Sequence, residues 1–210
     1  MGMPGVGKGT QATVLRDHLG VPHVSTGDIL REAVRAGTAL GRRVKSILDS
    51  GQLVSDDLMR ELIAERLGQD DAREGFILDG FPRTQEQVKV LDGVLEQLHI
   101  SMDAAYVLTA PEDEIVRRLG GRRVCPKCSE VYHLETKSPA SAGVCDACGS
   151  ALVQRADDTE AVIRDRLRVY AEQTMPVAET YRERGLLREI DATGPPDEVA
   201  GRLKKAVGKP

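Results

Sequence analysis

The chain has 210 residues, which is enough for one substantial hydrophobic core with room for an inserted subdomain. Its net charge is −4, its aromatic content is only 3% and it has no Trp, so the composition does not favour a nucleic-acid-binding protein. No apolar run approaches the roughly 18 residues of a membrane span and no signal peptide is recognisable, so we predict a cytoplasmic protein without a membrane partner. In that compartment, four Cys are better explained as metal ligands than as disulfides.

The first recognisable element is a phosphate-binding loop over residues 2–10. Its sequence is Gly2-Met3-Pro4-Gly5-Val6-Gly7-Lys8-Gly9-Thr10, which has the form G-x-x-x-x-G-K. The glycines let backbone N–H groups converge on a polyphosphate, and the following helix directs its positive N-terminus at the same anion. Lys8 adds a mobile point charge for the terminal phosphates. An ordinary flexible loop would explain the glycines, but not their combination with Lys8 and Thr10.

A loop of this kind normally follows a buried hydrophobic strand, and here only Met1 precedes it. We therefore expect the first, central strand of the sheet to be missing from this chain. Two hypotheses follow. Either Met1 is not the natural start and a short apolar segment lies upstream, or the protein is truncated, with weak activity and an open central slot.

Helices are predicted for most of the stretch from the loop to residue 67. The first continues the loop over residues 11–19 and ends at Gly20, and the second is opened by the cap-like sequence of residues 25–28. A short helix over residues 40–48 follows. Ser55 and two acidic residues then cap a helix with apolar residues at helical spacing.

Two buried strands are predicted next, over residues 76–78 and 104–108. The helix between them runs to about residue 98, and Thr84 with Gln87 three residues later forms a capping box at its start. Pro111 and three acidic residues open the helix after the second strand.

Residues 121–158 interrupt this alternation and contain all four Cys. A long helical pattern over residues 159–184 is interrupted at Pro176, and a short strand over 188–190 and a helix over 197–207 complete the chain. Alternation of apolar strands with helices predicts an α/β fold, with a parallel sheet flanked by helices.

Asp79 follows the first predicted strand directly, at the edge where ligands of open α/β sheets bind. A carboxylate there would hold Mg²⁺, directly or through water, beside the phosphates of the loop. The alternative is a solvated turn or capping Asp, which the neighbouring phosphate-binding loop makes less favourable.

Arginine is the second chemical signal. Phosphoryl transfer spreads negative charge over equatorial oxygens and needs fixed cations more than a base, although most arginines in any protein are solvated. The candidates are Arg31, Arg83, Arg118, Arg122, Arg123, Arg155, Arg164 and Arg166.

The cysteines form two pairs, Cys125-x2-Cys128 and Cys145-x2-Cys148, with 16 residues between them. This spacing is typical of a structural zinc ribbon, in which four thiolates complete a tetrahedral site and leave no open position for catalysis. Four free thiols or two disulfides are the alternatives, and His133 is a possible additional ligand.

Several motifs taken together resemble the adenylate kinases, in the bacterial long-lid form with a zinc-bearing lid. The resemblance covers essentially the whole chain. It rests on the phosphate-binding loop, Ser25-Thr26-Gly27-Asp28, Leu53-Val54, Gly80-Phe81-Pro82-Arg83, Gly121-Arg122-Arg123-Val124, Val131-Tyr132-His133 and Gln154-Arg155-Ala156-Asp157-Asp158.

The resemblance implies a P-loop NTPase-like fold with three parts. The core would comprise residues 1–24, 55–120 and 159–210, the helical AMP-binding insert residues 25–54, and the zinc-bearing lid residues 121–158. It further implies a monomeric kinase that reversibly transfers the terminal phosphoryl group of MgATP to AMP, giving two ADP. The family's Phe–Pro bond is cis, so the resemblance implies a cis bond between Phe81 and Pro82.

The resemblance also implies the site residues. Those on the ATP side would be Gly5, Val6, Gly7, Lys8, Gly9, Thr10, Arg118, Val131, Tyr132 and Gly194. Those on the AMP side would be Thr26, Arg31, Gln52, Leu53, Val54, Gly80, Phe81, Pro82, Arg83, Gln87, Arg155 and Arg166. The groups at the transferred phosphoryl would be Lys8, Asp79, Arg83, Arg122, Arg155 and Arg166, with Asp157 and Asp158 organising the arginines.

Three alternatives remain open. A UMP/CMP-type kinase would share the scaffold, although the long lid and Gln87 argue against it. A P-loop ATPase or binding module could use a zinc ribbon to bind protein or nucleic acid, which the acidic balance disfavours. The third is an inactive relative.

Overall fold

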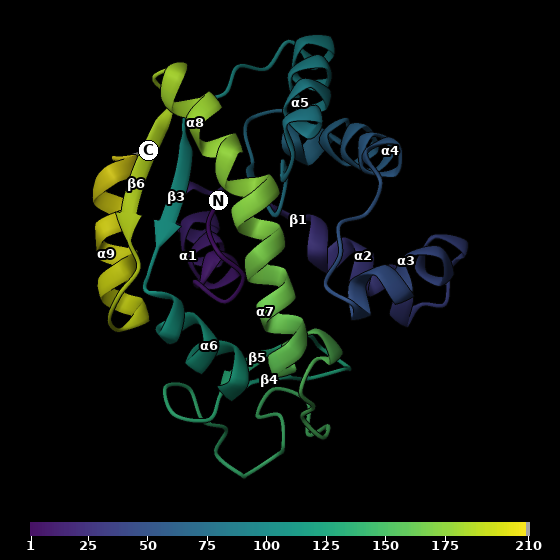
Figure 1. The fold of residues 1–210 in the computed structure, drawn as a ribbon, viewed down its shortest axis with the longest axis vertical. Helices are drawn as coiled ribbons and strands as arrows, with labels where there is room; N and C mark the ends of the chain where they lie inside the picture. The colour runs from purple at the N-terminus through teal and green to yellow at the C-terminus, as the bar shows by residue number, and fades with distance from the viewer. Residues whose placement is uncertain (209–210) are drawn as a thin grey trace.

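The structure, a computed structural model that describes residues 1–208, contains parallel strand pairs surrounded by helices (Figure 1). Strand β1 (His23–Ser25) pairs with β2 (Ile77–Asp79), and β3 (Ala105–Thr109) pairs with β6 (Leu187–Asp191). The prediction of an α/β fold with parallel strands and flanking helices is confirmed. Strand β1 was not predicted, because three residues between Pro22 and a helix start carry too little periodicity to indicate a strand.

The two strand pairs are separate ladders, and Met1 and Gly2 lie beside one of them. Gly2 forms an isolated parallel bridge with Leu108, whose N–H donates to the Met1 carbonyl at 3.0 Å. The amino group of Met1 donates to the Tyr106 carbonyl. Met1 and the first residue of the phosphate-binding loop, Gly2, therefore lie alongside β3.

The helices begin and end close to the predicted residues. Gly20, at φ 71°, closes α1, and Ser25 Oγ accepts from the Asp28 N–H at the start of α2. The helices are α1 (Lys8–Leu19), α2 (Thr26–Arg35), α3 (Ala39–Asp49), α4 (Asp56–Leu67), α5 (Gln85–Leu98), α6 (Glu112–Gly121), α7 (Glu160–Val169), α8 (Met175–Glu183) and α9 (Pro196–Val207), with short 3₁₀ turns at Asp70–Ala72 and Ala156–Asp158.

Two helix predictions differ from the structure in detail. The interruption predicted at Pro176 is a π-helical turn over Tyr170–Thr174. Pro176 has no backbone N–H to donate, and the helix accommodates this missing hydrogen bond by widening in the turn before the proline ring. At α5, Thr84 accepts from the Gln87 N–H as a capping box requires, but the Gln87 side chain accepts from Arg83 N–H instead of from Thr84.

Apolar packing fixes the phosphate-binding loop against α6. Val6 is buried among Leu108, Ile115 and Leu119 in the cluster that joins α1, α6, α7 and α9. Gly5 has φ +83°, and a Cβ there would lie 2.6 Å from Leu119 Cγ, so only glycine allows this contact. The second large cluster joins α2, α3, α4 and α5.

Residues 121–158 form an excursion below α6 and α7 in the view of Figure 1. Strands β4 (Arg122–Val124) and β5 (Val131–His133) pair in antiparallel register within it. Among residues 1–208, no helix has the length and apolarity that crossing a membrane requires. The bond between Phe81 and Pro82 is cis, as predicted.

Candidate functional site

A cleft of about 1090 Å³ lies between the phosphate-binding loop, α6, α7 and the excursion. This volume is slightly above the range for small-molecule sites, roughly 300–1,000 Å³. All ten residues expected on the ATP side line this cleft, although they come from four separate stretches of the chain. The structure therefore brings together residues that the sequence places as far apart as Gly5 and Gly194.

Lys8 lies partly buried at the floor of this cleft. Its Nζ donates to the carbonyls of Gly2 and Met3, at 2.7 and 2.8 Å. Burial lowers the pKa of Lys8 to about 7, and although Asp79 opposes this shift, the nearby arginines reinforce it. The loop thus holds Lys8 where the protonated form is unfavourable in free energy unless an anion lies close by.

Three arginines crowd the same region. Burial lowers the pKa of Arg83, Arg155 and Arg166, and each of them is also repelled by at least one other arginine, so that the pKa of Arg155 falls to about 9. Mutually repelling buried cations are stabilised by a multivalent anion that touches several of them at once.

Two aspartates hold part of this cluster in place. Asp158 is 1% exposed and accepts from Nε of Arg122 at 2.7 Å and from Nη1 of Arg166 at 3.2 Å. Arg166 also lies 2.9 Å from Asp157 Oδ2. The two carboxylates therefore fix the direction in which the Arg122 and Arg166 guanidinium groups point.

Asp79 ends β2 at the floor of the cleft, next to Lys8 and His23. Burial alone would raise its pKa, but the His23 ring and the charge of Lys8 outweigh burial and lower the pKa to about 2. His23 Nε2 lies 3.5 Å from the Asp79 carboxylate. Asp79 is consequently an ionised oxygen donor at neutral pH, which is the type of ligand that Mg²⁺ prefers. His23 was not predicted as part of the site.

Arg118 joins three parts of the cleft. Its guanidinium donates to the carbonyls of Val6 at 3.2 Å and Ala192 at 2.9 Å, and Glu114 accepts from its Nε at 2.9 Å. Two other candidates, Arg123 and Arg164, line neither cavity: Arg123 donates to the Gly120 carbonyl at the end of α6, and Arg164 donates to Glu160 within α7.

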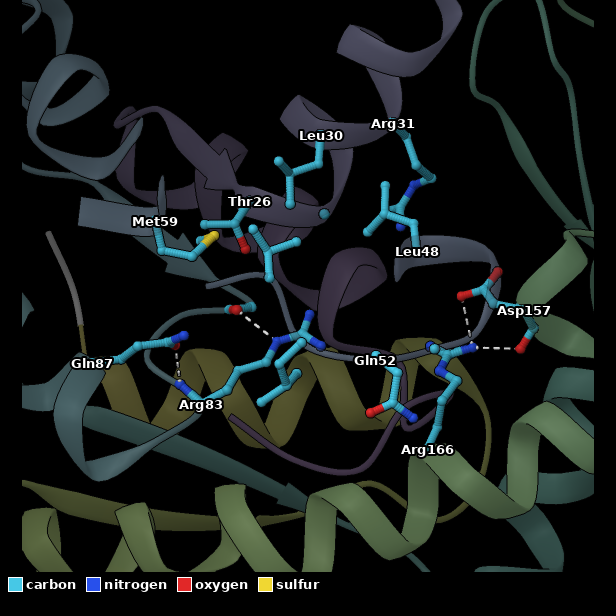
Figure 2. A pocket seen from close by; sticks show the side chains of 15 residues that line it. Thr26, Leu30, Arg31, Leu48, Gln52, Met59, Arg83, Gln87, Asp157 and Arg166 are labelled. Carbon is cyan, nitrogen blue, oxygen red and sulfur yellow. Dashed lines mark hydrogen bonds and ion pairs between the residues drawn. The ribbon is translucent and has the colours of Figure 1, made fainter. Parts of the chain in front are cut away.

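A second, smaller cavity opens beside the cleft between α2, α3, α4 and the loop after β2 (Figure 2). Nine of the twelve residues expected on the AMP side line it, and the other three, Phe81, Pro82 and Arg155, line the larger cleft. Arg83 and Arg166 border both. Leu30, Leu48 and Met59 form apolar walls that were not predicted, because apolar residues at helical spacing give no sign of a cavity.

The four Cys of the excursion lie together as predicted, with all their Sγ atoms within 4.8 Å of one another. The closest pairs are Cys125 with Cys148 at 3.4 Å and Cys128 with Cys145 at 3.5 Å. Sulfurs bound to one tetrahedral zinc at about 2.3 Å each would be ~3.8 Å apart, so this donor set fits that ion. His133 is not part of the group.

Comparison with known proteins gives consistent matches. The family model for adenylate kinase matches residues 1–186. The chain is 49% identical over 208 residues to a protein named adenylate kinase from Methanocella arvoryzae, covering 99% of this chain and 96% of that protein. It is 48% identical over 209 residues to one of the same name from Moorella thermoacetica, covering 100% and 96%. It is 50% identical over 193 residues to one from Kosmotoga olearia, covering 92% and 90%.

Proposed function

Because this chain belongs to the adenylate kinase family and so transfers a phosphoryl group from ATP to AMP to give ADP, we propose here how its own residues perform that reaction. The observation that carries the proposal is the convergence of four partly buried cations in the larger cleft, two of which also line the smaller cavity. Lys8, Arg83, Arg155 and Arg166 come from four separate stretches of sequence, and all line the larger cleft. A triphosphate and a monophosphate placed end to end satisfy these charges together.

ATP occupies the larger cleft in this proposal. Backbone N–H groups of residues 5–10 and the N-terminus of α1 hold its phosphates, and Lys8 turns from the Gly2 and Met3 carbonyls to the terminal phosphates. The adenine lies against Arg118, near Gly194, and Val131 and Tyr132 cover it from the excursion.

AMP occupies the smaller cavity. Its phosphate faces Arg31 and Arg83, and its base lies between the apolar walls, within reach of Thr26 and Gln87. Gln52, Leu53 and Val54 close the cavity with their backbone, and Arg155 and Arg166 bridge the two phosphate chains.

Transfer then needs no general base, because the acceptor is already a phosphate oxygen anion. Alignment of the two phosphate chains and neutralisation of the charge that spreads over the transferred group account for the acceleration. Arg122 and Arg166 are held ready by Asp158, so little reorganisation is needed when that charge develops. Mg²⁺, held with ATP near Asp79, supplies further charge neutralisation when bound.

We also propose the division into parts: a core of residues 1–24, 55–120 and 159–210, an insert of residues 25–54, and a lid of residues 121–158. Closure of the insert and lid would exclude water, which competes with AMP as acceptor. Cys125, Cys128, Cys145 and Cys148 would hold a structural Zn²⁺ that keeps the lid rigid. A cytoplasmic monomer is the state that the family resemblance implies, and the net charge of −4 disfavours a nucleic-acid partner.

A coupled assay of ADP formation tests the proposal. With ATP alone we expect negligible turnover, and addition of AMP should raise it by orders of magnitude, whereas UMP and CMP should support little. ADP formation that does not depend on AMP would indicate an ATPase, and a preference for UMP or CMP would indicate the related pyrimidine kinases.

A further inference from the structure

The side-chain amide of Gln87 makes two hydrogen bonds inside the protein. It is 2% exposed, its Oε1 accepts from the backbone N–H of Arg83 at 2.8 Å, and its Nε2 donates to Oδ1 of Asp56 at 2.8 Å. Figure 2 shows the Gln87 amide beside the backbone nitrogen of Arg83, while the Arg83 side chain extends away from Gln87 along the smaller cavity. Asp56, the first residue of α4, does not line that cavity.

These two partners allow only one orientation of the amide. A backbone N–H can only donate, and an ionised carboxylate can only accept. Rotating the amide by 180° would set an N–H against the Arg83 N–H and an oxygen against the Asp56 carboxylate, so both hydrogen bonds would be lost. The positions of oxygen and nitrogen on Gln87 are therefore fixed by chemistry.

The fixed orientation matters because the amide keeps one more hydrogen on Nε2 and a second lone pair on Oε1. An adenine edge presents an amino donor beside a ring-nitrogen acceptor, whereas a 6-oxo purine presents a carbonyl acceptor beside a ring N–H donor. A freely turning amide matches either edge, since rotation exchanges its donor and acceptor. A locked amide matches only one of them.

We propose that Asp56 is a positioning residue that locks the Gln87 amide and thereby sets the preference for 6-amino over 6-oxo purine monophosphates. The inference rests on the proposed function, because it requires the base of the monophosphate to lie in the smaller cavity. Sites that read a base edge by hydrogen bonds discriminate strongly, because the wrong edge leaves buried polar groups without partners.

The test compares the kcat/KM of AMP with that of IMP in the full-length protein and three variants. Asp56→Ala removes the acceptor, Asp56→Asn keeps an oxygen in its place, and Asp57→Ala is the matched control. Asp57 is exposed in the same first turn of α4, so the two alanine variants lose the same favourable helix-dipole interaction.

For Asp56→Ala we expect the KM for AMP to rise and the AMP/IMP preference to fall, each about tenfold, the effect of losing one hydrogen bond to a charged group. The KM for ATP should not change. Asp56→Asn should recover most of the preference, and Asp57→Ala should behave as the parent protein. An Asp56→Ala protein that keeps the full AMP/IMP preference overturns the proposal, as does an equal loss in Asp57→Ala.

Side-chain amide resonances of Gln87, followed by NMR in the nucleotide-free protein, give a readout independent of turnover and of thermal stability. In the parent and Asp56→Asn, the Gln87 Nε2 hydrogen that is donated to residue 56 should exchange slowly with solvent, and in Asp56→Ala it should exchange faster. Identical exchange in all three would contradict the lock. A parent protein that does not prefer AMP would instead refute the proposed function, so the two failures are distinguishable.

Discussion

Single buried charges decide what this site can bind. Lys8 and the arginines around it each lose hydration, and their pKa values are lowered. Asp79 is the opposite case, a buried carboxylate that stays ionised because His23 and Lys8 surround it. A charged side chain that loses hydration in the ligand-free protein gains the most electrostatic stabilisation when a ligand of opposite charge binds beside it.

Lys8→Ala should therefore nearly abolish transfer without unfolding the protein. The hydrogen bonds of the ammonium group go to the loop carbonyls of Gly2 and Met3, so its removal leaves the apolar packing of Val6 intact. We expect kcat to fall by about 10³-fold, the scale of losing one aligned charge at a transferring phosphoryl. The coupled assay with ATP and AMP measures this, and an active Lys8→Ala protein would contradict the role given to the loop.

The lowered pKa of Lys8 also predicts how stability depends on pH. In the unfolded chain Lys8 keeps its proton up to its usual pKa of 10.5, whereas in the folded protein it releases the proton near pH 7. The unfolded state therefore binds more protons between these values, so the free energy of unfolding rises with pH through this window, by up to about 1.4 kcal/mol per pH unit.

Lys8→Met lacks this group and isolates its effect from other titrations. We expect the variant to be the more stable protein at pH 7, with the difference shrinking as the pH approaches 10. Urea unfolding at pH 7, 8 and 9 measures the difference. A constant gap between the two proteins would show that Lys8 is not desolvated in the folded state.

At the scale of elements, α2 contacts the excursion directly. The Arg35 guanidinium donates to Ser129 Oγ at 2.6 Å and to the Pro126 carbonyl at 3.3 Å, beside the first cysteine pair. These hydrogen bonds join the two segments that are proposed to close over the substrates, so they favour the closed arrangement.

Arg35→Ala should weaken that arrangement. A dinucleoside polyphosphate that fills both cavities should bind roughly three- to tenfold more weakly, as expected for hydrogen bonds worth about 0.5–1.5 kcal/mol. Arg42→Ala is the matched control, since Arg42 donates to Gly37 within the same insert. Calorimetric titration of both variants measures this, and equal affinities would mean that the Arg35 contact does not stabilise closure.

Local chemistry accounts for which elements could be predicted. Caps at Gly20, Ser25 and Thr84 mark helix ends through bonds between neighbouring residues, so their positions follow from the sequence. Strand β1 and the π-helical turn have no such local signal, since a three-residue strand is defined by its partner and the turn by packing around Pro176.

At the scale of the whole molecule, the residues expected at the site came from recognised motifs, whereas the apolar residues that form the walls of the cavity were not predicted. The expected nucleotide-site residues all line one of the two cavities, because phosphate-binding chemistry restricts residue types closely. Leu30 and Met59 resemble any core residue until α2 and α4 are placed side by side across the cavity. His23 was missed for a similar reason, since its partner Asp79 is 56 positions away in sequence.

Metal removal tests the excursion as one unit. Its described apolar cluster is small, with Cys125, Tyr132 and Cys145 at its centre, so a bound metal would supply much of its stability. Chelation should lower the thermal midpoint and speed amide exchange across residues 121–158 before turnover at low temperature declines. Metal analysis of the purified protein should give one zinc per chain, and unchanged unfolding after chelation would contradict a structural site.

The ion pair between Arg122 and Asp158 joins the two ends of that excursion across 36 positions of sequence. Helices α6 and α7 are therefore joined to the excursion at one fixed neck, the Arg122–Asp158 pair, whatever the sequence of the segment between these two residues. Loop-closure entropy grows only slowly with loop length, so residues can be gained or lost inside such a segment at little cost. The excursion is thus an exchangeable module that can vary in length and in metal ligands, while the neck keeps the Arg122 guanidinium fixed against Asp158.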